Sequence, residues 1–103
     1  MSVDVIRTGD SREDLNRILA YFLDENESAV GTRFLDAYEM TLSFISDFPE
    51  LGSPWESLEP CLKDVRVKLI VGFEKYLVFY RVSARGVYIL HVFHGHQDID
   101  HLL

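Results

Sequence analysis

The hydrophobic pattern changes its period once along the chain, at the proline- and glycine-containing loop from Pro49 to Pro54. Before this loop, apolar residues recur three or four positions apart, which is the spacing of an amphipathic helix. After it they recur at every second position, as is typical of β-strands. With only 103 residues, the chain has room for one modest core. The pattern therefore predicts a single α+β domain covering residues 1–103.

Two helices are expected before the loop, preceded by a short strand at Val3 to Arg7. Ser11 is the predicted N-cap of the first helix, with Asp14 as the acidic partner of a capping box, and Ser28 is the predicted cap of the second. The short link between the helices favours an antiparallel hairpin. The apolar stripes expected to face the core are Leu15, Ile18, Leu19, Phe22 and Leu23 in the first helix and Phe34, Tyr38, Thr41, Leu42, Ile45 and Phe48 in the second.

Three strands are expected after the loop, at residues 65–71, 76–82 and 87–94. Short turns at residues 72–75 and 83–86 separate them, so they should form an antiparallel meander. The predicted order is β-α-α-β-β-β, with the helical hairpin packed on one face of a mainly antiparallel sheet. The place of the first strand in this sheet stays open.

The face of the sheet away from the helices is expected to be apolar and to carry cations. If Val65, Val67, Leu69 and Val71 face the helices, the next strands can be phased so that apolar and basic side chains share the outer face. Such a patch would suit a partner protein; the alternative is that the loop around Trp55 folds back and covers it. We expect the patch to be exposed and to bind a partner protein. The outer-face residues in this phasing are Arg66, Lys68, Ile70, Leu77, Phe79, Arg81, Val87, Ile89, His91 and Phe93.

The net charge and the single cysteine limit which classes of function this protein can have. The formal net charge is −7, which argues against direct nucleic-acid binding because phosphate neutralisation needs a basic surface. Cys61 is the one cysteine, which indicates a reduced thiol in the cytoplasm. Neither a signal peptide nor an apolar run long enough to span a membrane is apparent, so we expect no membrane association.

Three of the four histidines lie in the segment HVFHGHQD, from His91 to Asp98. His91 and His94 are three positions apart on the expected strand, so their side chains should point to opposite faces. Metal ligands need a convergent geometry, and we therefore expect no metal and no cofactor here. Gly95 should let the chain turn, and Asp98 should cap a short apolar tail.

Three phrases of the sequence, in this order, resemble the ParE branch of the RelE/ParE superfamily of type II toxins. They are FPELGSP, VRVKLIVGFEKYLVFYRV and GVYILHVFHGHQD. The resemblance covers nearly the whole chain, including the helical hairpin. It departs from the family at His96 and Gln97, where relatives often carry an arginine.

The resemblance implies a cytoplasmic toxin that binds DNA gyrase, blocks replication and is not an enzyme. It also implies a hetero-oligomer with a cognate, ParD-like antitoxin. The tail around His94, His96, Gln97 and Asp98 is the predicted target-binding segment. The predicted antitoxin-binding surface consists of Arg66, Lys68, Ile70, Leu77, Phe79, Arg81, Ile89, His91 and Phe93.

Two alternatives stay open. The first is a ribosome-dependent mRNA endonuclease of the RelE type, which would use Arg66, Lys68 and Arg81 to contact phosphate. Gln97 and Leu103 stand where the RelE branch has an arginine and a tyrosine, and neither can replace those groups chemically. The second alternative is a homologue that has lost its toxicity and only binds the antitoxin.

Overall fold

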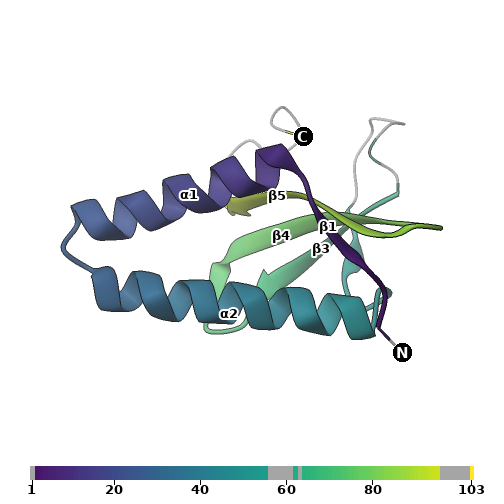
Figure 1. Cartoon of the computed structure of the whole chain (residues 1–103), viewed down its shortest axis with the longest axis horizontal. Helices are drawn as coiled ribbons and strands as arrows, with labels where there is room; N and C mark the ends of the chain where they lie inside the picture. Colours follow the sequence, from purple (N-terminus) through teal and green to yellow (C-terminus); the bar gives the residue numbers. More distant parts are fainter. Residues whose placement is uncertain (1, 56–61, 63, 96–102) are drawn as a thin grey trace.

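A computed structural model describes residues 2–55, 62, 64–95 and 103. Two helices pack on a five-stranded sheet whose strand order is β1-β5-β4-β3-β2 (Figure 1). The elements are β1 (Val5–Arg7), α1 (Gly9–Asp24), α2 (Ser28–Asp47), β2 (Ser53–Pro54), β3 (Val65–Ile70), β4 (Phe73–Ser83) and β5 (Gly86–His94). The predicted α+β class and the β-α-α-β-β-β order are confirmed, with the two-residue strand β2 added before β3.

The first strand lies at the edge of the sheet and is parallel to β5, with Val5 opposite Val87. All the other strand pairs are antiparallel. β1 pairs only with the first part of β5, up to Ile89. The rest of the β5 edge lies beside α1, which runs along the top of Figure 1, while α2 runs along the bottom.

α1 begins one turn earlier than the sequence pattern suggested. Its N-cap is Thr8, whose hydroxyl oxygen accepts a hydrogen bond from the Ser11 amide at 3.2 Å and donates to the Ile89 carbonyl at 2.6 Å. The prediction of Ser11 as N-cap was wrong, because Thr8 is anchored to β5 and caps the helix from there. Asp14 consequently has no capping-box role. The prediction of Ser28 as the cap of the second helix was also wrong, because Ser28 is the first residue of α2 and its N-cap is Glu27, which makes no side-chain capping hydrogen bond.

The helix-side core is built from the apolar stripes of both helices and one face of β3, β4 and β5. Two expected members are missing from it: Leu23 and Phe48 are 66% and 63% exposed, because each lies at or just beyond the end of its helix. The buried residues of this core are Phe22, Phe34, Tyr38, Leu42, Ile45, Ile70, Val78, Tyr80, Val87, Ile89 and Val92.

The buried phenol of Tyr38 predicts a loss of stability at alkaline pH. Burial raises the pKa of Tyr38 to about 12 from the ordinary value of 10.0. The unfolded chain therefore ionises first, and the stability that is complete below pH 10 is lost as the pH rises to about 12. We expect Tyr38 to account for a fall of about 2 kcal/mol in the free energy of unfolding.

Urea denaturation between pH 8 and about 12 measures this fall. Tyr76 and Tyr80 also have a pKa raised by burial, so the wild-type slope contains their share as well. Tyr38→Phe is the control that isolates the first phenol. If this variant kept the full wild-type slope, the assignment to Tyr38 would be wrong.

The predicted phasing of the sheet was wrong in β3 and in part of β5. Val65 and Val67 lie on the face away from the helices, opposite Arg81 and Phe79, whereas Ile70 is in the helix-side core. Ile89 is also in that core. Irregularities of register between Leu69 and Ile70, and between Phe79 and Tyr80, break the simple alternation.

The outer face of the sheet is covered by the chain itself. Leu62, Val65, Phe79 and Phe93 form a second buried cluster, and Trp55 and Leu103 pack against it. The Trp55 ring meets Phe79 edge-on, with ring centroids 5.3 Å apart. The segment at Trp55 therefore covers the Phe79 and Phe93 part of this face, which is the alternative considered above, while Leu77, Arg81 and His91 on the same face stay partly accessible.

Candidate functional site

The segment FPELGSP is held in place by two side chains of the sheet. The Tyr80 hydroxyl donates to the Pro49 carbonyl at 2.8 Å and accepts from the Gly52 amide at 2.7 Å. Arg66 donates to the Gly52 carbonyl at 2.6 Å, and its other terminal nitrogen lies 2.6 Å from the Glu50 carboxylate. Arg66 is therefore engaged in fixing this loop.

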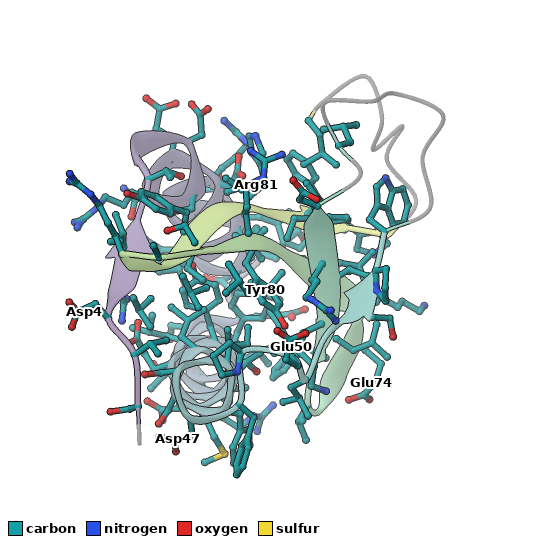
Figure 2. All side chains as sticks on the ribbon, turned by 90° about the vertical axis from the view of Figure 1, so that its right-hand side faces the viewer. Asp4, Asp47, Glu50, Glu74, Tyr80 and Arg81 are labelled. Carbon is teal, nitrogen blue, oxygen red and sulfur yellow. The ribbon has the colours of Figure 1, made fainter. Side chains whose placement is uncertain are left out.

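The three cations proposed for phosphate contact do not share a face of the sheet. Arg66 lies opposite Tyr80 and Lys68 opposite Val78, and both of these partners belong to the helix-side core. Arg81 lies opposite Val65 on the outer face. Figure 2 shows Tyr80 and Arg81 pointing to opposite sides of β4. These side chains therefore cannot converge on one phosphate.

Asp14 joins α1 to the edge of β5 that β1 leaves open. Its carboxylate accepts from the Val92 amide at 3.2 Å, lies 2.8 Å from His91 Nδ1 and 3.3 Å from an Arg17 nitrogen. Asp14 is 5% exposed. It thus satisfies a backbone donor of a strand edge that would otherwise be unpaired.

The sequence analysis missed this role of Asp14, although the pattern contained a signal. Asp14, Ile18 and Phe22 follow one another four positions apart, so the carboxylate lies on the apolar face of α1. A carboxylate on a buried helical face needs hydrogen-bond partners. The partners are far away in sequence, on β5, and only the fold identifies them.

His91 has the surroundings of a structural side chain. Its ring stacks on Phe93, with centroids 4.5 Å apart, and Nε2 lies 4.0 Å from the Asp10 carboxylate. Both ring nitrogens therefore face acidic groups. Within the described part of the chain, no hydroxyl or thiol is hydrogen-bonded to His91, so it has no nucleophile to activate.

The structure divides the nine residues of the predicted antitoxin-binding surface into two groups. Four are buried, namely Ile70, Phe79, Ile89 and Phe93. The other five are partly accessible: Arg66, Lys68, Leu77, Arg81 and His91. They do not form one exposed face, since Arg66 and Lys68 lie on the opposite side of the sheet from Leu77 and Arg81.

A cleft of about 390 Å³ lies between α1 and the end of β5, next to the start of the predicted target-binding tail. Arg17, Tyr21, Tyr76 and His94 are among the residues that line it. The His94 ring meets the Tyr76 ring edge-on, with centroids 5.1 Å apart. The other tail residues of the prediction, His96, Gln97 and Asp98, lie outside the described residues.

No group of three or more potential metal ligands occurs among residues 2–55, 62, 64–95 and 103. Neither described helix is long and apolar enough to cross a membrane.

Comparison with known families identifies the fold and its class of activity. The model of the family described as "ParE toxin of type II toxin-antitoxin system, parDE" matches residues 5–99. The chain belongs to the ParE toxin family. It is accordingly the toxin of a ParDE-type toxin–antitoxin system, as the resemblance of its motifs implied.

One curated relative agrees with this assignment, and one solved structure agrees with the fold. Toxin ParE3 of Caulobacter vibrioides is 30% identical over 95 residues, which cover 92% of this ParE-family chain and 89% of that protein. A solved structure described as a chromosomal ParDE TA system from P. aeruginosa superimposes with a TM-score of 0.70. It covers 90% of this chain and 96% of the other at 15% identity, so it supports the fold alone.

Proposed function

We propose that this ParE-family toxin binds DNA gyrase, blocks replication without catalysing a reaction of its own, and is neutralised by a cognate ParD-like antitoxin. The gyrase target follows from the resemblance to the ParE branch. The observation that carries the choice against mRNA cleavage is the placement of the cations. Arg66 is hydrogen-bonded to Gly52 and paired with Glu50 in the FPELGSP loop. Arg81 lies on the other face of the sheet from Lys68.

The end of the chain supports the same choice. Leu103 packs against the outer cluster that contains Phe79 and Phe93. In the RelE branch a tyrosine near this position takes part in proton transfer. An apolar side chain packed on a core supplies neither a proton nor a charge to a phosphate.

The antitoxin should contact the accessible part of the predicted surface, on the Leu77 and Arg81 side of the sheet. The antitoxin must also accommodate a toxin with a net charge of −7. Apolar contacts and a few local cations should therefore contribute more than long-range attraction.

Expression of the toxin without its antitoxin tests the target. In the first minutes after induction, we expect thymidine incorporation to fall while methionine incorporation continues. The purified chain should also inhibit gyrase supercoiling, and co-expressed antitoxin should restore thymidine incorporation. An early loss of methionine incorporation would instead indicate the nuclease, and normal growth with folded toxin would indicate a homologue without toxicity.

The tail can be tested with substitutions that keep Leu103. Truncation from His96 onward would also remove Leu103 from the outer cluster, so it would confuse folding with function. His96→Ala combined with Gln97→Ala avoids this. We expect the combined variant to inhibit gyrase about tenfold more weakly, a loss of ~1.4 kcal/mol, with an unchanged unfolding midpoint. Arg85→Ala, in the exposed β4–β5 turn, is the matched control, and equal inhibition by all three proteins would refute the tail assignment.

A further inference from the structure

The C-terminal half of α2 and the residues that follow it carry four exposed apolar side chains. Met40, Phe44, Phe48 and Leu51 are 56%, 42%, 63% and 45% exposed. Met40 and Phe44 lie one turn apart on α2, whereas Phe48 is the C-cap residue and Leu51 belongs to the loop that follows the helix. Figure 1 shows α2 at the lower margin of the molecule with the sheet above it. A contiguous apolar surface of this kind indicates a binding site.

The same face of α2 carries a charged residue on each side of Met40. Arg33 lies seven positions before Met40, and Asp47 lies seven positions after it. Seven residues are close to two helical turns and rise about 10 Å, so the three side chains fall on one line along the helix. Arg33 and Asp47 are both exposed, and Figure 2 shows Asp47 below α2, on the side away from the sheet. The face thus has Arg33 at one end and Asp47 at the other, with Met40 and Phe44 between them and the exposed Asp36 one turn before Met40.

We propose that α2 packs against α2 of a second copy of this chain, antiparallel, about a two-fold axis near Met40. An isologous interface requires a self-complementary surface. Antiparallel packing about Met40 places Arg33 of each copy opposite Asp47 of the other, and Met40 opposite itself. A parallel arrangement would place like charges opposite each other. The charge order along α2 therefore selects the antiparallel one.

The shape of the face fits the same arrangement. In antiparallel packing about Met40, Phe44 of one copy lies level with Asp36 of the other and next to the small Ala37. Ala37 is the small residue one turn before Thr41 and is only partly buried by its own core.

Most of the nearby carboxylates do not oppose this contact, because they are already paired within the chain. Glu39 receives two hydrogen bonds from Arg7, at 2.5 and 2.6 Å. Glu50 is paired with Arg66. The Arg7 hydrogen bonds also lower the pKa of Glu39, so this pair persists at neutral pH. Asp36 stays near the contact as a negative charge and should weaken it to a small extent.

Sedimentation velocity of the purified full chain tests the dimer. At tens of micromolar, we expect a mass of twice the 11.9 kDa of the chain. Arg33→Asp alone, or Asp47→Arg alone, places two like-charge pairs across the interface and should raise the dissociation constant about tenfold. The double variant, Arg33→Asp with Asp47→Arg, restores both pairs and should return the constant to within about threefold of the wild type.

A second pair of variants separates this face from other exposed apolar residues. Phe44→Ser should produce monomers with an unchanged circular dichroism spectrum and unfolding midpoint. Leu23→Ser, at a more exposed position on α1, should leave the dimer intact.

Three results would overturn the inference. The first is a wild-type chain that stays monomeric at 100 micromolar. The second is a charge swap that fails to restore the dimer. The third is a monomeric wild type whose complex with the antitoxin is lost on Phe44→Ser, which would assign this face of α2 to the antitoxin.

Discussion

Replacing Gly52 by alanine is expected to lower the free energy of unfolding by about 3 kcal/mol. A Cβ at this position would lie 2.6 Å from the Tyr80 hydroxyl oxygen and 2.8 Å from the Val67 carbonyl oxygen. Neither atom can withdraw easily, since Tyr80 is fully buried and Val67 is paired within the sheet. The loop must move, and the two hydrogen bonds of the Tyr80 hydroxyl are weakened with it.

Urea denaturation measures this loss, and Gly9→Ala is the matched control. A Cβ at Gly9 meets nothing within 4 Å, and Gly9 opens α1, so that substitution should change stability by less than about 0.5 kcal/mol. In a Tyr80→Phe background the hydroxyl is gone, and Gly52→Ala should then cost less than in the wild type. A cost below about 1 kcal/mol for Gly52→Ala in the wild type would contradict this account of the loop.

Replacing Asp14 by alanine should have a comparable effect, a loss of about 3 kcal/mol. The substitution leaves the Val92 amide without an acceptor at a buried strand edge and removes the contact with His91 Nδ1. It also removes the tie between α1 and β5. Besides the lower stability, hydrogen exchange at the Val92 amide should become faster.

Asp10→Ala is the control for the Asp14 substitution. The Asp10 side chain is 72% exposed and lies 4.0 Å from His91 Nε2, so its loss should change stability by less than about 0.5 kcal/mol. If the two variants were equally stable, the hydrogen bonds between Asp14 and β5 would not contribute measurably to the stability of the fold. Toxicity should be compared per amount of folded protein, because Asp14 and Gly52 act on the fold and not on the target.

The order of elements could be predicted from the sequence because the hydrophobic period is strong in each half of the chain. Phe34, Tyr38, Leu42 and Ile45 recur at helical spacing, and all four are buried. The same pattern failed at the ends of the helices. Phe48 continues the spacing of α2, but the helix ends at Asp47, and its ring faces solvent.

The phasing of the sheet could not be predicted, because β4 and β5 are apolar on both faces. Alternation assigns faces only where one face is polar. Here the register also shifts between Phe79 and Tyr80, so Ile89 and Phe93 lie on opposite faces even though they are four positions apart. The predicted antitoxin surface was affected by this, and four of its members are buried.

The sequence by itself determined the two helices, the four longer strands, their order and the family, since these depend on local periodicity and on motifs that are contiguous in the chain. The tertiary structure alone decided what those residues do. Arg66 and Tyr80 hold the FPELGSP loop, Asp14 satisfies the edge of β5, and the outer face of α2 stays open. Each of these roles depends on how distant segments of the chain pack together. Such packing cannot be read from the hydrophobic period of the sequence.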